Sequence, residues 1–211
     1  VGKAEGKKNV AIIGAGPAGL EAAYIAGQRG HSVTVYEASD RLCGGQLRMA
    51  SSSPCKDILQ HVPEFFKVQL ERMDNVEIKL NTPVTESNVG DLNADYVLLA
   101  TGATPLVLPI PGIEKAKIAQ DVLLHKAEVS GNVVICGGGQ VGVETALELL
   151  ERGHKVSIVE MLPDLILKEE LMTRIVMMKK LADAEVPVYC RHKVSRFTDG
   201  AVEIEDMQTG E

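Results

Sequence analysis

Residues 10–19 have the sequence VAIIGAGPAG, a short apolar run that continues directly into G-x-G-x-x-G. An apolar run of this kind, bounded by glycine, is typical of a strand buried on both faces of a parallel sheet. The glycines that follow allow a tight turn into an alanine-rich segment that ends in Arg-Gly, as helices often do. The stretch therefore predicts a strand, a glycine turn and a helix in immediate succession.

The same pattern returns 123 residues later, at positions 133–142. When residues 10–37 are aligned with residues 133–160, 12 of the 28 positions are identical, whereas roughly two would match by chance. Parallel strands joined by a helix need a right-handed crossover, so the repeat predicts two βαβ units. Their expected strands are residues 10–13, 33–37, 133–136 and 156–160, and their expected helices are residues 17–28 and 140–151.

Weaker signals organise the rest of the chain. Three prolines between Pro105 and Pro111 mark a linker, because proline extends neither a helix nor a central strand. A boundary near Pro111 predicts two domains, residues 1–110 and 111–211. The other expected elements are a helix at 57–73, with Pro63 either breaking it or starting a second helix, a strand at 76–80, a buried strand at 95–100, a helix at 168–183, and a β-hairpin at 194–206 that turns at Asp199-Gly200.

The composition is that of an ordinary globular protein. The chain has 211 residues, 45% hydrophobic and 24% charged, and a net charge of −7. An acidic chain with 3% aromatic residues lacks the basic face and the stacking side chains of a nucleic-acid-binding protein. No apolar run reaches the roughly 18 residues that span a bilayer, and residues 2–8 are rich in lysine and lack the hydrophobic core of a signal segment, so a cytoplasmic location is expected. A chain that starts at Val1 is expected to be cut from a longer protein or left by tag removal.

The four cysteines are Cys43, Cys55, Cys136 and Cys190. Their spacing contains neither a CxxC pair nor another zinc-type pair. Neither a disulfide framework nor a metal site is therefore expected.

The glycine turns point to dinucleotide binding. In such a turn the first glycine allows the tight bend, the second lets the backbone approach a pyrophosphate, and the third lets helix and strand pack closely. The helix N-terminus that follows offers free N–H groups to the phosphates. An acidic residue at the end of the second strand can accept the ribose hydroxyls of an adenosine. The residues concerned are Gly14, Gly16, Gly19 and Glu37 in the first copy and Gly137, Gly139, Gly142 and Glu160 in the second.

A single G-x-G-x-x-G can also arise for steric reasons alone. Here strand, helix, acidic residue and duplication agree, which favours two dinucleotide sites. In the second copy no Lys or Arg follows Glu160 before Lys168. A 2′-phosphate would meet a carboxylate and no cation, so NADH is expected to bind better than NADPH. The alternative is that Glu160 is a solvated strand end.

The two glycine patterns, with Val97-Leu98-Leu99-Ala100-Thr101-Gly102 ahead of the linker, resemble the two-dinucleotide-binding-domain flavoproteins of the pyridine nucleotide-disulfide oxidoreductase superfamily. The resemblance implies an α/β fold of two Rossmann-like βαβ domains with parallel sheets, the first binding FAD and the second NAD(P)H. The residues that it assigns to FAD are Gly14, Gly16, Pro17, Ala18, Gly19, Glu37, Ala38, Arg41, Gly44, Gly45, Gln46, Ala100, Thr101 and Gly102. Those that it assigns to NAD(P)H are Gly137, Gly139, Gln140, Val141, Gly142 and Glu160.

A narrower resemblance is carried by Arg41-Leu42-Cys43-Gly44-Gly45-Gln46-Leu47. It is similar to a G-G-Q loop in the NADH:flavin oxidoreductases related to 2,4-dienoyl-CoA reductase, enoate reductase and trimethylamine dehydrogenase. In that group an N-terminal barrel, absent from this chain, carries FMN and a 4Fe-4S cluster. The resemblance implies an electron-input module in which NADH reduces FAD and electrons pass on to the barrel and an unsaturated substrate. The repeat offset of 123 places the counterpart of the strand at Val97 near residue 220, beyond Glu211, so the second domain is expected to lack its final strand. The resemblance implies that the first domain is also incomplete, because in that family the chain returns to complete it, so the FAD site is expected to be incomplete and the fragment inactive alone.

Two other functions stay open at this stage. One is a module that holds ADP without redox chemistry, as the trimethylamine dehydrogenase branch suggests. The other is an NADPH-dependent reductase like the small subunit of glutamate synthase, which the acidic Glu160 disfavours.

Five further positions have structural interpretations. The disulfide reductases of the superfamily use a C-x4-C or CxxC pair, which this chain lacks, so Cys43 is expected to pack rather than to react. His31 and His154 hold equivalent places and are expected to have loop roles. Glu21 and Glu144 are expected in the first turn of each helix, where they interact favourably with the helix dipole.

Overall fold

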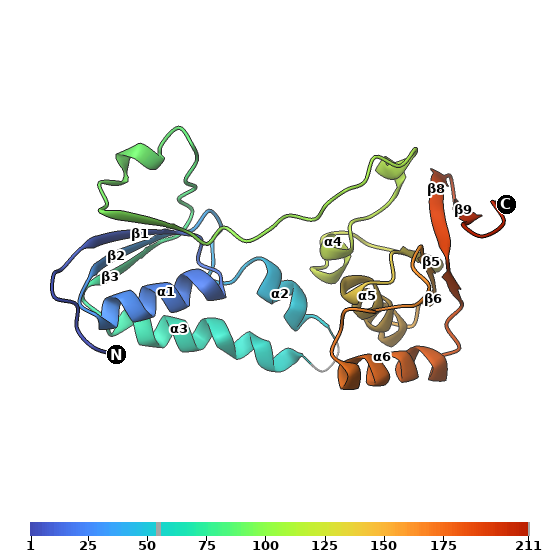
Figure 1. The fold of residues 1–211 in the computed structure, drawn as a ribbon, viewed down its shortest axis with the longest axis horizontal. Coiled ribbons are helices and arrows are strands. Elements are labelled where there is room, and N and C mark those ends of the chain that lie inside the picture. The colour runs from blue at the N-terminus through green and yellow to red at the C-terminus, as the bar shows by residue number, and fades with distance from the viewer. Residues whose placement is uncertain (54–55, 211) are drawn as a thin grey trace. The chain divides into compact units, whose positions relative to one another are not determined.

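The computed structural model describes residues 1–53 and 56–210, so Cys55 lies outside the described residues, and it divides the chain into two compact units (Figure 1). Unit 1 comprises residues 1–51 and 56–104, and unit 2 comprises residues 105–210 together with Ser52 and Ser53. The division follows Thr104, at the start of the proline-rich segment. Within the described ranges no helix has both the length and the apolar content to cross a lipid bilayer.

Unit 1 is a parallel α/β structure. Its elements are β1 (Asn9–Ile13), α1 (Pro17–Gln28), β2 (Ser32–Tyr36), α2 (Gln46–Ser51), the 3₁₀-helix η1 (Asp57–Gln60), α3 (His61–Glu71), β3 (Val76–Lys79), the 3₁₀-helix η2 (Val89–Leu92) and β4 (Tyr96–Leu99). The four strands form one sheet, sheet A, in the order β3-β2-β1-β4. Because β2 and β4 lie on opposite sides of β1, the carboxyl ends of β1 and β4 form the switch point at which such sheets bind ligands.

The core of unit 1 lies between sheet A and two helices. Helices α1 and α3 lie side by side (Figure 1). Leu20 of α1 and Leu70 of α3 are packed in one buried cluster with Ile12 and Val35 of the sheet. This cluster fixes the position of α1, and therefore of the glycine turn that precedes it.

Unit 2 repeats this design with a smaller sheet. Its elements are the 3₁₀-helix η3 (Ile113–Lys115), α4 (Ala119–Leu123), β5 (Asn132–Cys136), α5 (Gln140–Glu151), β6 (Lys155–Glu160), α6 (Leu171–Asp183), β7 (Val188–Cys190), β8 (His192–Thr198) and β9 (Ala201–Asp206). Sheet B is parallel with the order β5-β6-β7, and β8 and β9 form a separate antiparallel hairpin. The predicted pair of βαβ units is thus confirmed.

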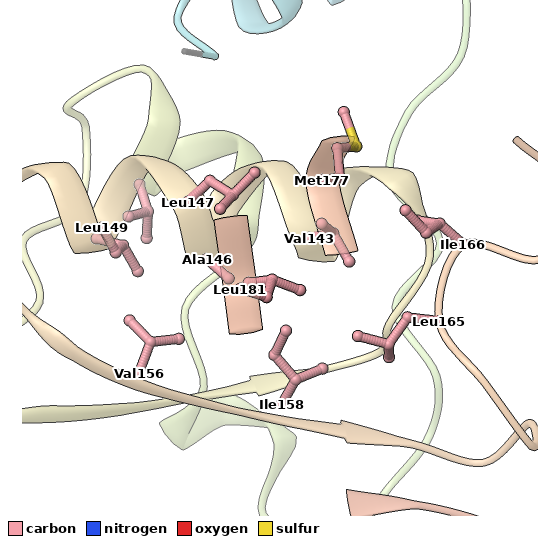
Figure 2. Close-up of a cluster of buried hydrophobic side chains, with 11 residues drawn as sticks. Val143, Ala146, Leu147, Leu149, Val156, Ile158, Leu165, Ile166, Met177 and Leu181 are labelled. Carbon is pink, nitrogen blue, oxygen red and sulfur yellow. The ribbon is translucent and has the colours of Figure 1, made fainter. Parts of the chain in front are cut away.

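Figure 2 shows the core of unit 2. Val143 and Ala146 of α5 face Val156 and Ile158 of β6, and Leu181 of α6 lies beside them. Fully burying an aliphatic side chain contributes about 1.5–3 kcal/mol. The cluster therefore holds α5 against sheet B and so fixes the position of the glycine turn that precedes α5.

Several local predictions are confirmed with small shifts. Pro63 does not break the helix: it lies in the first turn of a second helix, α3, which begins at His61, and an N–H in the first turn has no helical acceptor to lose. The hairpin turns at Asp199-Gly200, with Thr198 paired to Ala201. The last helix begins at Leu171, because the side chain of Glu170 accepts the N–H groups of Met172 and Thr173 and caps it.

Two predictions of buried strands are wrong. Every residue of β4 is exposed, including Leu99 at 74%. In β5, Val134 is 39% exposed and Cys136 is also exposed. Both are edge strands, because within the described residues β4 pairs only with β1 and β5 only with β6. A continuous apolar run cannot by itself distinguish an edge strand from a central one.

Five short elements were not predicted. They are α2, α4, β7 and the 3₁₀-helices η2 and η3, which have between three and six residues each. Elements of that length complete too few turns or alternations to produce a periodic signal.

Candidate functional site

The glycine turn of unit 1 lies between β1 and α1. Gly14 has a φ of +106°, and a Cβ there would lie 2.3 Å from the carbonyl oxygen of Ala100. A Cβ on Gly19 would lie 1.9 Å from the carbonyl oxygen of Gly14. A Cβ on Gly16, in contrast, would meet no atom within 4 Å. The packing of the protein requires Gly14 and Gly19, whereas Gly16 borders open space of the kind that a pyrophosphate needs.

The turn between β5 and α5 divides these roles in the same way. A Cβ on Gly142 would lie 1.9 Å from the carbonyl oxygen of Gly137, and a Cβ on Gly139 would meet nothing within 4 Å. Gly137 has a φ of +113°, but a Cβ there would also meet nothing. The reason is that no described residue of unit 2 takes the place that Ala100 takes beside Gly14.

Both turns end at helix N-termini without side-chain caps. The N-cap residues are Gly16 in α1 and Gly139 in α5, and both have extended backbones. The N–H groups in the first turn of each helix are therefore available to an anion, except at Pro17 of α1, which has none, and the helix dipole favours an anion there. The other predicted contacts in these first turns are Pro17, Ala18, Gln140 and Val141, of which Val141 is 44% exposed.

The acidic residue that follows β2 is held by the glycine turn. Oε2 of Glu37 accepts a hydrogen bond from the N–H of Ala15 (2.7 Å), and Oε1 accepts from the N–H and the hydroxyl of Ser39 (2.8 Å each). We call this arrangement the carboxylate clamp. Partial burial alone would raise the pKa of Glu37, but the hydrogen bonds from Ser39, Ala15 and Ala38 favour the charged form and lower that pKa overall.

Unit 2 contains the same carboxylate clamp. Oε2 of Glu160 accepts from the N–H of Gly138 (2.6 Å), and Oε1 accepts from the N–H of Leu162 (2.7 Å). Gly138 and Leu162 are the repeat equivalents of Ala15 and Ser39. Sequence reasoning missed all four donors, although their fixed offset of 123 residues is a signal that points to them. The duplication thus extends from the backbone to the orientation of one carboxylate.

The two segments that carry the flavoprotein resemblance meet in unit 1. Gln46, the first residue of α2, donates from Nε2 to the carbonyl oxygen of Ala103 (3.1 Å). Ala103 follows Thr101-Gly102, where Gly102 is exposed and has a φ of +73°. Gly44 and Gly45 directly precede Gln46 in the chain. Arg41 is exposed and forms an ion pair with Asp40 (2.7 Å from Nε to Oδ1).

Cys43 occupies a packing position. It is 3% exposed, and its N–H donates to the carbonyl oxygen of Ala15 (2.9 Å). Its repeat equivalent, Ile166, is equally buried and donates in the same way to Gly138 (2.9 Å). Burial, together with the charge of Glu37, raises the pKa of the Cys43 thiol to about 11. A thiol with such a pKa is a poor nucleophile, and an isoleucine at the equivalent place supports packing.

Glu21 and Glu144 do not lie in the first turn of their helices, so that prediction is wrong. Helix α1 begins at Pro17 and α5 at Gln140, which places each glutamate in the second turn, beyond the strongest effect of the dipole. Glu144 is 6% exposed and accepts a hydrogen bond from Nε2 of Gln140 (3.1 Å). Its position is therefore explained by local hydrogen bonding.

The two equivalent histidines lie far from the turns along their sheets. His31 directly precedes β2 and His154 directly precedes β6. They are therefore at the amino ends of the strands, whereas the glycine turns follow the carboxyl ends. Nδ1 of His31 accepts the N–H of Lys8 (3.3 Å), which agrees with a role in loop structure.

Comparison with known proteins gives close matches. Residues 8–211 match the family model described as pyridine nucleotide-disulphide oxidoreductase. The chain is 41% identical over 180 residues to an NADH oxidase of Thermoanaerobacter brockii. The aligned region covers 82% of this chain and 27% of that protein. It is also 43% identical over 164 residues to a cinnamate reductase of Clostridium sporogenes. That aligned region covers 78% of this chain and 24% of the reductase.

A solved structure matches the whole chain. It is a 2-naphthoyl-CoA reductase in complex with 2-naphthoyl-CoA, with a TM-score of 0.91 and 27% identity, covering 100% of this chain and 32% of that chain. The chain therefore spans about a quarter of the length of the two curated relatives and about a third of the solved one.

Proposed function

Because the chain belongs to the pyridine nucleotide-disulphide oxidoreductase family, we propose that it binds FAD in unit 1 and NADH in unit 2. In this proposal it is the electron-input part of a larger flavin-dependent oxidoreductase. The observation that carries the proposal is the pair of carboxylate clamps, each beside a glycine that borders open space. Duplicated geometry of this kind is suited to two adenine dinucleotides.

The residues present fit the two cofactors. In unit 1, the space at Gly16 and the N-terminus of α1 would take the pyrophosphate of FAD, and Glu37 would accept its ribose hydroxyls. In unit 2, Gly139, the N-terminus of α5 and Glu160 would do the same for NADH. The segment from Gly44 to Gln46 and the segment 100–102 would contact FAD. When both cofactors are bound, NADH supplies a hydride and FAD accepts it.

The named relatives support an unsaturated final substrate. Two of them are named as reductases of cinnamate and of 2-naphthoyl-CoA, in both of which a carbonyl carbon is attached to unsaturated carbon. We propose that the partner of this chain is a barrel domain of the parent protein that carries FMN and a 4Fe-4S cluster, as in the group that the G-G-Q loop resembles. The chain itself would bind and orient the two dinucleotides.

Anaerobic reduction tests the proposed function. We expect the larger protein that contains this chain, freed of unbound flavin, to retain FAD and to lose the visible absorbance of the flavin when NADH is added, and we expect the chain alone to retain little flavin. The retained flavin is measured by absorbance before and after NADH. A larger protein that stays colourless but retains ADP would support the nucleotide-holding alternative and overturn the electron-input proposal.

Glu160 is proposed as the main reason for a preference for NADH. Its carboxylate would accept the ribose hydroxyls of NADH and repel a 2′-phosphate. Glu160→Ala should weaken NADH binding about tenfold, the usual loss for a hydrogen bond that involves a charged group, and should narrow the difference from NADPH. Titration calorimetry with both nucleotides measures this.

The matched control is Glu151→Ala, which removes an exposed glutamate at the end of α5 in the same unit. It should leave both affinities unchanged. Equal affinities for NADH and NADPH in the unmodified chain would contradict the assignment.

A further inference from the structure

A left-handed residue closes each carboxylate clamp from the neighbouring strand. In unit 1, Asn81 has a φ of +52° and donates its N–H to the carbonyl oxygen of Ser39 (2.9 Å). In unit 2, Arg191 has a φ of +61° and donates its N–H to the carbonyl oxygen of Leu162 (3.1 Å). Ser39 and Leu162 are the residues whose N–H groups bind the clamped carboxylates. The same backbone arrangement therefore occurs in both units.

The strand register confirms that Asn81 and Arg191 are equivalent. Tyr36 of β2 pairs with Lys79 of β3, and its repeat equivalent, Val159 of β6, pairs with Tyr189 of β7. Each left-handed residue lies two positions beyond that pair. The separation is 110 residues here (191 − 81), not the 123 of the glycine repeat. For this reason the sequence repeat does not reveal the pair.

The two equivalent residues differ in charge, and Arg191 lies close to Glu160. Cys190 is paired with Glu160 in sheet B, and Arg191 follows it. Burial raises the pKa of the Cys190 thiol, the charges of Asp164 and Glu160 raise it further, and the charge of Arg191 lowers it. All of these charges therefore act on one small region at the carboxyl end of sheet B.

The guanidinium of Arg191 is available to a ligand. Arg191 is exposed, and among residues 1–53 and 56–210 no carboxylate forms an ion pair with it. Two acidic neighbours have hydrogen-bond or ion-pair partners of their own, although the pKa of Asp206 is lowered by the backbone hydrogen bond from Gln208 and also by the charge of Arg191. Asp164 pairs with the guanidinium of Arg174, and Oδ1 of Asp206 accepts the N–H of Gln208 (2.7 Å).

We infer that Arg191 is a specificity-determining residue that binds a phosphate on the 2′ position of the adenosine ribose, and that Glu160 opposes it. The inference rests on the proposed binding of a nicotinamide nucleotide by unit 2. FAD carries no 2′-phosphate, and unit 1 has the neutral Asn81 at the equivalent place. An exposed arginine beside the ribose carboxylate is suited to a phosphate, because its planar fork binds phosphate oxygens in pairs. The choice between NADH and NADPH then depends on the opposite charges of Glu160 and Arg191. The sequence had predicted no cation near Glu160.

Paired substitutions test this balance. Glu160→Gln removes the negative charge and keeps the shape of the side chain, and Arg191→Asn gives unit 2 the residue that unit 1 has. Asparagine adopts a positive φ more readily than most residues, so Arg191→Asn preserves the backbone. All proteins also carry Gly16→Val, so that unit 1 does not bind the titrant. NADH and NADPH are titrated calorimetrically into each protein at low and at high salt.

We expect Glu160→Gln to bind NADPH more tightly than NADH. The double variant should bind NADPH about tenfold more weakly than Glu160→Gln does, the usual loss for one charged contact. The gain should shrink at high salt, because screening weakens an exposed charge pair. Arg191→Asn alone should weaken NADPH binding and leave NADH binding unchanged. Arg191→Lys should retain part of the salt-dependent gain.

Three results would count against the inference. Equal NADPH affinities in Glu160→Gln and in the double variant would overturn it while leaving the proposed function intact. An equal loss of NADH and NADPH binding in Arg191→Asn would show a structural role instead. Failure of every protein, including the one with Gly16→Val alone, to bind either nucleotide would overturn the proposed function and this inference with it.

Discussion

Gly16→Val is expected to abolish nucleotide binding by unit 1, with a loss of affinity for FAD or ADP of about a hundredfold or more. A Cβ at Gly16 touches nothing in the protein, so the substitution should not disturb the fold. The valine would instead occupy the open space above the turn, which the pyrophosphate needs. Filter binding or calorimetry with FAD and ADP measures the loss, and far-UV circular dichroism should stay unchanged.

Gly90→Val is the matched control for this experiment. Gly90 also belongs to unit 1, and a Cβ there likewise meets nothing within 4 Å, but it lies in η2, far along the chain from the turn. It should bind FAD and ADP as the unmodified chain does. A folded Gly16→Val protein that retains either nucleotide would contradict the placement of the pyrophosphate.

Gly142→Ala is expected to destabilise unit 2 by about 3 kcal/mol, at the upper end for an overpacked site. The added Cβ would lie 1.9 Å from the carbonyl oxygen of Gly137 and 3.3 Å from Cγ2 of Ile135. Backbone cannot move away as a side-chain tip can, so α5 must shift from β5. Urea unfolding followed by circular dichroism measures the change in the free energy of unfolding.

Gly139→Ala provides the comparison within the same turn. A Cβ there meets nothing within 4 Å, so the free energy of unfolding should change by less than about 1 kcal/mol, as at sites without a packing or backbone constraint. If both variants are equally stable, then close packing is not the reason for the third glycine.

The βαβ units and the carboxylates were predictable because they depend on short-range patterns. Glycine spacing, apolar runs and a residue 23 positions after Gly14 are all visible in the chain. Arg191 was not predictable, because its closeness to Glu160 depends on the pairing of β6 with β7, a three-residue strand. The distance along the chain between a strand and its neighbour varies with the connection, and no pattern in the sequence encodes it.

The burial of β4 was mispredicted for a related reason. Its apolar residues resemble those of β1, but burial depends on what lies beside and above a strand. Within the described residues β1 has a neighbour on each side and β4 has one. An apolar amino-acid composition is therefore compatible with a central strand as well as with an edge strand.

The exposed strand β4 has a practical consequence for work with this chain in solution. One of its edges presents unpaired N–H and C=O groups within the described residues, beside side chains such as Tyr96 and Leu99 that are 63% and 74% exposed. An edge of this kind is a template on which another strand can add, and natural proteins usually protect it with charge or proline. Concentrated samples will therefore tend to associate edge to edge, and dilute conditions favour the monomer on which nucleotide affinities are best determined.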